Sequence, residues 1–287
     1  LLTRAKASLF YTIFVLIGAI LIGPRVVTTL TTKISQVSFG EYSGLIIIVS
    51  SALMIFLSNL LKIPQSTSFI TVAAFSGAAF YYRQLNWNII LKIFFVSVLF
   101  CSLVFVITYF IKKIFYPPRN SNFWLYEKSV VHSGKIKNFI VLTDCYSAFA
   151  VGTNNIANVV APVLLSINFN AVLCIFFVGL FFGLGSLVFG KGVINTISKE
   201  IVPIGKISAG IISLVTSSFV IIASLFGLPT PYVQFTTFSV LAISSIKDGF
   251  YLTYKKSVVK KIISVWIVIP ILTFLLSYLL HFLFLKL

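Results

Sequence analysis

Long apolar stretches separated by short polar loops run through the whole chain. Each of the longest holds roughly 18 or more largely apolar residues, the length with which a helix crosses about 30 Å of hydrocarbon. These stretches predict transmembrane helices at residues 8–23, 44–61, 88–111, 170–190, 207–226 and 258–285. Three more, interrupted by polar residues or proline, lie at 66–81, 139–162 and 232–246. The pattern predicts an all-α polytopic membrane protein whose helices are embedded in a lipid bilayer.

The composition supports a membrane protein and excludes a soluble globular domain. Of the 287 residues, 59% are hydrophobic and 9% are charged, and the mean hydropathy is +1.09. The cysteines stand alone in apolar runs without Cys-x-x-Cys spacing, which predicts packed thiols: Cys101, Cys145 and Cys174. His132 and His281 are isolated as well. We therefore expect no catalytic residues, no metal, no cofactor and no enzymatic activity.

The net charge of +17 comes from lysine and arginine, which in membrane proteins concentrate in cytoplasmic loops. We therefore expect no nucleic acid as a partner. If each half of the chain has five crossings, one side holds 17 basic residues: Arg4, Lys6, Lys62, Lys112, Lys113, Arg119, Lys128, Lys135, Lys137, Lys191, Lys199, Lys206, Lys247, Lys255, Lys256, Lys260 and Lys261. Lys92 lies inside a helix, and only four fall on the other side: Arg25, Lys33, Arg83 and Lys286. This asymmetry predicts a multi-pass protein of the cytoplasmic membrane, with residue 1 and the 112–138 linker in the cytoplasm and the C-terminus outside.

The chain resembles itself at an offset of about 165 residues. GPRVVTTLTTKI at 23–34 is similar to GKGVINTISKEI at 190–201, and LLKIPQSTSFITVAAFSG at 60–77 is similar to LFGLPTPYVQFTTFSVLA at 225–242. Such repeats predict a transporter built from two homologous halves with the site between them, and an odd number of crossings per half predicts inverted topology.

We expect residues 1–111 to form the first transmembrane repeat, 112–138 a basic cytoplasmic linker and 139–287 the second repeat. The linker contains Pro117 and Pro118 and shows no apolar period. The first-half counterpart of GTNNIAN (152–158) is expected before Leu1, so the first repeat is predicted to be incomplete at its N-terminus.

Polar side chains inside a bilayer are costly unless they pair or face a cavity, so clusters of them are candidate sites. The first is the Asn cluster, which consists of Thr153, Asn154, Asn155 and Asn158. Asn154 and Asn158 share a helix face, whereas Asn155 points about 100° away. Gly152 and Pro162 are positions where a helix can break or kink. Amides also bridge membrane helices, but this concentration favours a binding site.

Two further clusters follow prolines in matching positions of the two halves. One is Pro64-Gln65-Ser66-Thr67-Ser68 with Thr71, and the other is Pro229-Thr230-Pro231-Tyr232 with Gln234, Thr236 and Thr237. Hydroxyls at a helix start can simply cap backbone N–H groups, and they can also complete an anion site at the helix N-terminus. The second pair of prolines predicts a broken helix, and broken helices in matching positions indicate a transport site.

None of the carboxylates falls inside these clusters; they are Glu41, Glu127, Asp144, Glu200 and Asp248. Asp144 precedes Asn155 by eleven residues on the same predicted helix. We favour Asp144 as the cytoplasmic end of that helix, and the alternative is a relay for a proton or another cation.

The three clusters, in this order and spacing, resemble the inorganic phosphate transporter (PiT) family of anion permeases. Its GANDVANA-like signature matches residues 152–159, and its PVSTTH-like signature matches 64–69 and, weakly, 229–234. The strings GLFFGLGSLVFGKGVINTISKEI (179–201) and KKIISVWIVIPI (260–271) are also similar to the family. The resemblance covers the chain apart from the linker and implies a cation-coupled carrier of an inorganic oxyanion.

Departures from the family pattern indicate the bacterial sulfate permease branch. Phosphate carriers of the family have Asp where this chain has Asn155, and His where it has Phe69 and Gln234. Hydrogenphosphate can donate a proton to a buried carboxylate, but sulfate has none to donate and would be repelled by one. If the position binds only the coupling cation, the change concerns coupling instead.

The sequence thus predicts a sulfate importer with alternating access, coupled to H⁺ or Na⁺. The expected ligands of the anion or coupling ion are Asn154, Asn155, Asn158, Ser66, Thr67 and Ser68. A second tier comprises Thr71, Thr153, Thr230, Gln234, Thr236 and Thr237. The alternatives are a phosphate, thiosulfate or molybdate permease, and a non-transporting membrane scaffold. Whether the protein forms a homodimer stays open.

Overall fold

The computed structural model describes residues 3–35, 39–40, 42–117, 122–124, 133–167, 169–189 and 201–285. Within these ranges the helices are joined by short non-helical segments and there is no β-strand; a single bridge joins Ser35 to Leu85. The predicted all-α class is confirmed. The Asn cluster and both proline-led clusters lie inside the described ranges, whereas Glu41, Glu127, Glu200, His132 and residues 118–121 and 125–132 of the linker lie outside them.

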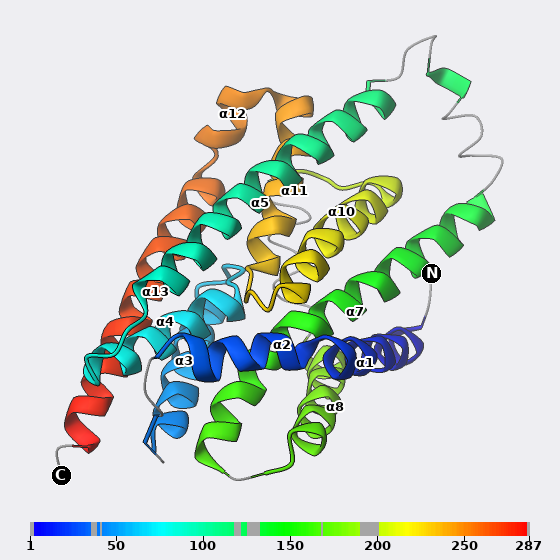
Figure 1. Ribbon diagram of the computed structural model, residues 1–287. Helices are drawn as coiled ribbons and strands as arrows, with labels where there is room; N and C mark the ends of the chain where they lie inside the picture. The colour runs from blue at the N-terminus through cyan, green and yellow to red at the C-terminus, as the bar shows by residue number, and fades with distance from the viewer. Residues whose placement is uncertain are drawn as a thin grey trace.

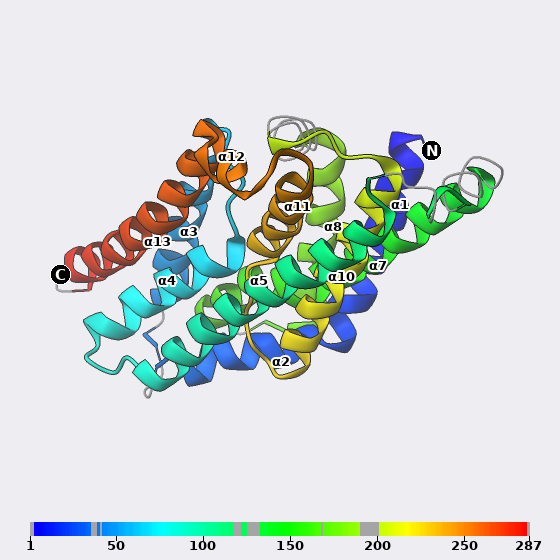
Figure 2. The same ribbon diagram turned by 90° about the horizontal axis from the view of Figure 1, so that it is seen from above.

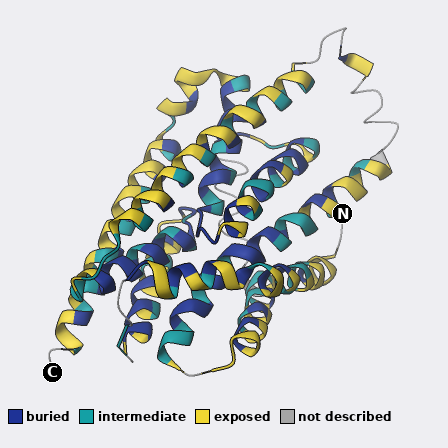
Figure 3. Ribbon diagram, in the orientation of Figure 1, coloured by how far each residue is buried: buried dark blue, intermediate teal, exposed yellow. Residues whose placement is uncertain are grey.

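The long apolar stretches form helices within a few residues of the predicted bounds. They are α1 (Arg4–Leu21), α3 (Ser43–Leu60), α5 (Trp87–Phe115), α8 (Ala171–Phe189), α10 (Lys206–Leu225) and α13 (Ser257–Phe284). Together with α7 (Ser133–Ser166), all except α8 are long and apolar enough to cross a membrane, which gives six such helices in the described part of the chain. Exposed residues gather on the outer helices α5 and α13 (Figure 3), as expected for surfaces that face lipid.

Two shorter helices begin directly after the proline-led clusters. α4 (Thr67–Tyr81) and α11 (Tyr232–Asp248) each follow a non-helical segment that returns from the end of a long helix, α3 or α10. The start of α4 lies beside Trp266, well inside α13, because the Trp266 indole N–H donates to the Pro64 carbonyl oxygen at 2.9 Å. The predicted broken helices are thus present. Figures 1 and 2 show α11 near the middle of the molecule and α4 running from there toward the left, beside α13.

The N-terminal and C-terminal parts of the chain interlock around these short helices. α4 packs along α13, and α11 packs along α5. The Ser277 hydroxyl of α13 donates to the Ala74 carbonyl oxygen of α4 at 2.7 Å, and the Thr108 and Ser239 hydroxyls join α5 to α11 at 2.7 Å. Each short helix is therefore supported by a long helix from the other part of the chain.

The helix α7 runs through the centre of the molecule and contacts α1, α3 and α10. A break at Gly152 or Pro162 was an open expectation, but the helix is continuous through both residues. Gly152 serves packing instead: a Cβ there would overlap the Val15 carbonyl oxygen of α1, and a Cβ on Gly18 would overlap the Phe149 carbonyl oxygen of α7. Backbones approach this closely in membranes only where both helices carry small residues.

The shorter elements α2 (Gly23–Thr28), the π-helix η1 (Thr29–Lys33) and α12 (Phe250–Lys255) connect the long helices. At the α12 end, the Lys256 ammonium pairs with the Asp248 carboxylate at 2.6 Å and donates to the Ile201 carbonyl oxygen at 2.6 Å. In Figure 1, α12 and the linker ends of α5 and α7 occupy the upper part of the molecule, and the C-terminus lies at the lower left. The cysteines are all free, as predicted.

Candidate functional site

The Asn cluster of α7 meets the first proline-led cluster at the start of α4. The Ser68 hydroxyl donates to Asn154 Oδ1 at 2.9 Å, and Asn158 Nδ2 donates to Ser68 Oγ at 2.9 Å and to Thr67 Oγ1 at 3.3 Å. Ser68 and Asn154 are fully buried. Asn154 and Asn158 reach the same hydroxyl because they lie one turn apart on one face of α7.

Asn154 also joins the second proline-led cluster. Its Nδ2 donates to Ser224 Oγ at 3.0 Å and to the Leu228 carbonyl oxygen at 3.2 Å, and its Oδ1 accepts from the Thr230 backbone N–H at 3.3 Å. Thr153, the preceding residue, also contacts Ser224 Oγ at 3.1 Å. One asparagine of α7 thus bonds both the start of α4 and the non-helical segment before α11, so the three predicted clusters meet at one place.

The first turn of α4 lies at this site and has no side-chain cap. Ser66 occupies the N-cap position and is buried, yet no side chain makes a capping hydrogen bond there. Of the two interpretations left open for these hydroxyls, the structure does not show capping: the Thr67 and Ser68 hydroxyls bond Asn158 and Asn154 instead. The first N–H groups of a helix have no intrahelical acceptor and carry a partial positive charge, which favours an anion.

Two glutamines extend the site across the two short helices. Gln234 Nε2 donates to Gln65 Oε1 at 3.4 Å, and the Ser66 backbone N–H donates to the same oxygen at 3.2 Å. Within the described residues, four buried amide atoms of the three clusters have no hydrogen-bond partner: Gln65 Nε2, Gln234 Oε1, Asn155 Oδ1 and Asn158 Oδ1. An unpaired buried polar atom costs about 1–3 kcal/mol, so this concentration indicates that a polar species completes the site.

Pro162 adds one more acceptor. Because proline has no N–H, the backbone carbonyl of Asn158, four residues earlier in α7, lacks its usual helical donor. This carbonyl belongs to the same residue as the unpaired Asn158 Oδ1. The site therefore offers amide and hydroxyl donors, which suit an anion, and neutral oxygen atoms, which suit a cation.

The chain matches the model of the phosphate transporter family over residues 1–277. It belongs to that family. Among curated relatives, the sulfate permease CysP of Bacillus subtilis (strain 168) is 34% identical over 285 residues, which is 99% of this chain and 78% of the relative. The human sodium-dependent phosphate transporter 2 is 31% identical over 119 residues, which is 38% of this chain and 18% of the relative.

The fold agrees with this membership. A solved structure described as the sodium-dependent phosphate transporter superposes with a TM-score of 0.80, covers 99% of this chain and 90% of its own, and is 19% identical. Members of the phosphate transporter family and the named relatives are membrane transporters, so the expectation that the chain is not an enzyme is confirmed.

Asn155, Thr236, Thr237 and Thr71 take no part in the hydrogen bonds that join the three clusters. Asn155 makes no hydrogen bond with the described residues, in keeping with its direction about 100° from Asn154. Thr236 and Thr237 donate to carbonyl oxygens of their own helix, Tyr232 at 3.0 Å and Val233 at 2.9 Å. Thr71 is buried one turn beyond Thr67 on α4.

Asp144 does not end its helix, because α7 begins eleven residues earlier at Ser133. The favoured reading of Asp144 was therefore wrong. The residue is exposed on α7, where it accepts a hydrogen bond of 3.4 Å from the Ser213 hydroxyl of α10. The reason for the error is that the polar segment before residue 139 carries no apolar period, although it continues the helix beyond the bilayer-spanning part.

The expected ligands included neither Gln65, although it belongs to the first proline-led cluster, nor Ser224. Gln65 carried a signal, because a glutamine between Pro64 and three hydroxyls is unusual in an apolar region. Ser224 carried none, since a serine inside an apolar helix ordinarily bonds the carbonyl four residues earlier. Only the packing of α10 against α7 brings Ser224 to Asn154.

Proposed function

We propose that this member of the phosphate transporter family imports sulfate across the cytoplasmic membrane, driven by a coupling cation. Sulfate binds at the Asn154, Ser68 and Asn158 site, between the start of α4 and the non-helical segment before α11. Access alternates between the two sides of the membrane. The coarser statement, that the chain is a membrane transporter of this family, is established by the family match and its relatives.

The observation that carries the sulfate assignment is the neutrality of the site. The hydrogen-bonded residues are asparagine, glutamine, serine and threonine, and no carboxylate takes part among the described residues. Sulfate is fully deprotonated at neutral pH, so it needs donors and would leave a buried carboxylate unpaired. The 34% identity to a named sulfate permease along 99% of this chain supports the same substrate.

The coupling cation is proposed to bind beside the anion. Amide oxygens suit Na⁺, and the acceptors are Asn155 Oδ1, Asn158 Oδ1, Gln234 Oε1 and the Asn158 carbonyl oxygen. A proton requires a titratable group, and Asp144 is the one carboxylate on the six described helices that can cross a membrane. If the coupling ion is Na⁺, we propose that it binds to these oxygens. If it is H⁺, we propose that Asp144 relays it.

The halves are proposed to be inverted repeats. α4 and α11 follow proline-led segments that lie about 165 residues apart. Each is followed in turn by a long helix, α5 of 29 residues and α13 of 28 residues. Residue 1 and the linker then face the cytoplasm and the C-terminus lies outside, as the charge asymmetry predicts. The interlocked packing of α4 with α13 and of α11 with α5 supports this arrangement, because repeats of a transporter share one site.

Uptake of radiolabelled sulfate into proteoliposomes tests the proposal. We expect uptake of sulfate under an inward Na⁺ or H⁺ gradient. Phosphate should compete less strongly than unlabelled sulfate, and thiosulfate and molybdate should compete measurably. If phosphate were the strongest competitor, the substrate would be phosphate and the sulfate assignment would be wrong. Uptake of neither anion under either gradient, by folded protein of the full length, would favour the scaffold.

A further inference from the structure

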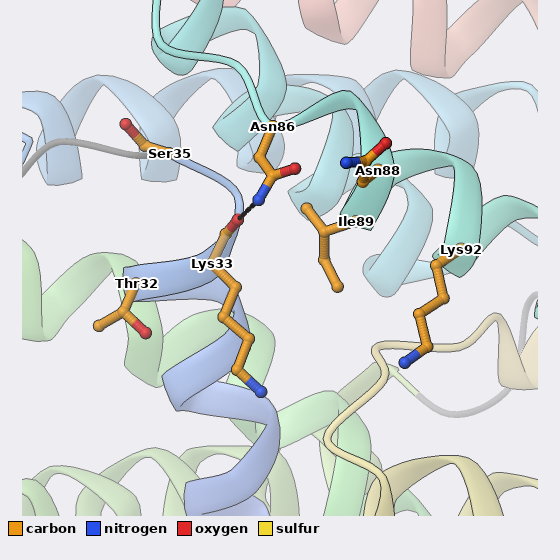
Figure 4. A pocket seen from close by; sticks show the side chains of 7 residues that line it. All are labelled: Thr32, Lys33, Ser35, Asn86, Asn88, Ile89 and Lys92. Carbon is orange, nitrogen blue, oxygen red and sulfur yellow. Dashed lines mark hydrogen bonds between the residues drawn. The ribbon is translucent and has the colours of Figure 1, made fainter.

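A second polar region lies at the start of α5, away from the site of Asn154, Asn158 and Ser68, which we call the Asn and Ser site. A cavity of about 380 Å³ opens between the end of η1 and the first turns of α5. It is lined by Thr32, Lys33, Ser35, Asn86, Asn88, Ile89 and Lys92 (Figure 4). The cavity is far larger than one tetrahedral oxyanion, so a hydrated anion fits in it.

The charge of this cavity is entirely positive. Lys33 and Lys92 extend in the same direction on either side of Ile89 (Figure 4), and no carboxylate is among the lining residues. Neither ammonium forms an ion pair with any residue that the structure describes. By contrast, Arg25 on the same side of the molecule donates to the Leu225 carbonyl oxygen at 2.8 Å and thus has a structural partner. Two unpaired cations with amide and hydroxyl neighbours are suited to a doubly charged oxyanion.

The backbone holds the two lysines at this position. Lys33 ends the π-helix η1, and its carbonyl oxygen accepts a hydrogen bond of 3.1 Å from Asn86 Nδ2 at the start of α5. π-Helical turns are rare and occur frequently at functional sites. The hydrogen bond fixes η1 against α5, so the spacing of Lys33 and Lys92 depends on both elements.

The cavity lies at the end of the molecule opposite to the linker. α5 begins beside the cavity and ends at Phe115, next to the linker. In the proposed orientation this end is external, where the positive-inside effect disfavours lysine. Topology therefore gives no reason for two lysines at one cavity.

A continuous apolar cluster connects the cavity to the Asn and Ser site. Ile34 and Ile93, the neighbours of Lys33 and Lys92, belong to the same buried cluster as Leu30, Phe75 and Ala157. Ala157 precedes Asn158 in α7. An anion at the cavity is thus separated from the transport site by tightly packed apolar side chains, which must move to let it pass.

We propose that the cavity between η1 and α5 is an outer docking site for a divalent inorganic oxyanion, held by Lys33 and Lys92 before it enters the transport site. This inference rests on the proposed function in two respects: that the cavity faces outside, and that sulfate is its natural ligand. Its action is to raise the local concentration of the anion, so it lowers the KM for transport and leaves kcat unchanged.

The first test measures binding without transport. The full-length protein in detergent is treated with an amine-acylating reagent, with sodium sulfate or with sodium chloride at equal ionic strength, and acylation is read by mass spectrometry. We expect sulfate to protect Lys33 and Lys92 but not Lys135 and Lys137, which are exposed on the first turns of α7. Protection should persist in the Asn155→Asp variant. Equal acylation in sulfate and chloride would overturn the docking site, whether or not the protein transports sulfate.

The second test measures transport by the Lys33→Gln/Lys92→Gln double variant. We expect the KM for sulfate to rise about threefold or more, kcat to stay the same, and the dependence of uptake on ionic strength to flatten. The Lys33→Arg/Lys92→Arg variant should behave as the unaltered protein, and so should Lys135→Gln/Lys137→Gln. An unchanged KM, or an equal loss in the arginine variant, would contradict the proposal.

A lipid headgroup offers the same phosphate-like chemistry, so both variants are compared in two kinds of vesicle. In purely zwitterionic vesicles and in vesicles with anionic lipid, a docking site for free anion predicts the same rise in KM. A rise confined to vesicles with anionic lipid would assign the cavity to a lipid headgroup and overturn the proposal.

Discussion

Ser68 is the residue through which α4 is fixed to α7. Its hydroxyl donates to Asn154 and accepts from Asn158, and all three side chains are buried. Asn154 continues the network to Ser224 and Leu228 on the other side. The network is neutral throughout, so the proposed binding of a fully deprotonated anion involves no proton transfer to its side chains.

Replacing Ser68 by alanine should damage both stability and transport. The change removes two hydrogen bonds of 2.9 Å, to Asn154 Oδ1 and from Asn158 Nδ2, and leaves these atoms only the longer bonds of 3.3 Å with the Thr230 N–H and Thr67 Oγ1. Each lost bond costs about 0.5–1.5 kcal/mol. We expect a lower unfolding temperature of the detergent-solubilised protein and loss of sulfate uptake. Ser102→Ala is the matched control, because the Ser102 hydroxyl on exposed α5 bonds only the Val98 carbonyl oxygen. Equal effects of the two changes would rule out the network as the support of the site.

Asn155 tests the neutrality of the site more directly. Asn155→Asp introduces a carboxylate beside the proposed anion, so sulfate uptake should fall about tenfold or more. Thr71→Ser, a conservative change on the buried face of α4, should have a much smaller effect. Initial uptake rates at several sulfate concentrations measure both, and equal losses would argue against direct contact between Asn155 and the anion.

At the scale of the elements, apolar length and proline positions predicted most of the fold. The long helices lie within a few residues of the predicted ranges, and α4 and α11 start where Pro64 and Pro231 indicate. The role of Gly152 was not predictable, because it depends on the approach of α1, which is distant in the sequence. Gln65 and Ser224 were missed for the same reason: their partners, Gln234 and Asn154, come from other helices.

The close contact of α1 with α7 makes a prediction about the helix pair. Gly152→Ala places a methyl group against the backbone of α1, which cannot yield as a flexible side chain does, and should destabilise the protein by about 1–3 kcal/mol. Gly185→Ala in α8 is the control, since a Cβ there meets no atom within 4 Å. Thermal unfolding in detergent measures both. An unaffected Gly152→Ala protein would mean that the two helices do not depend on this contact.

At the scale of the whole molecule, the two parts of the chain form one interlocked unit around the site. Each short helix is held by a long helix of the other part, α4 by α13 and α11 by α5. Any motion that opens the site to one side must therefore move a short helix together with its partner from the other part. Such coupled motion is what the proposed alternating access around one site requires.

The orientation of the protein in the membrane can be tested directly, because each chosen residue lies at a known end of a helix. Single cysteines are introduced into a protein whose Cys101, Cys145 and Cys174 have been replaced by alanine, and right-side-out vesicles are treated with a membrane-impermeant maleimide. All three chosen positions are exposed in the structure: Arg83, Lys135 and Lys255. Arg83→Cys, at the turn between α4 and α5, should react from outside.

Lys135→Cys and Lys255→Cys should react only after the vesicles are permeabilised, because they lie at the linker end of α7 and on α12. This result would place the linker and α12 on the same, cytoplasmic side, as inverted halves demand. Reaction of Lys135→Cys and Lys255→Cys from opposite sides would contradict the inverted arrangement itself. Reaction of all three with reversed sidedness would keep the arrangement and reverse the protein in the membrane, and the lysine cavity at the start of α5 would then face the cytoplasm.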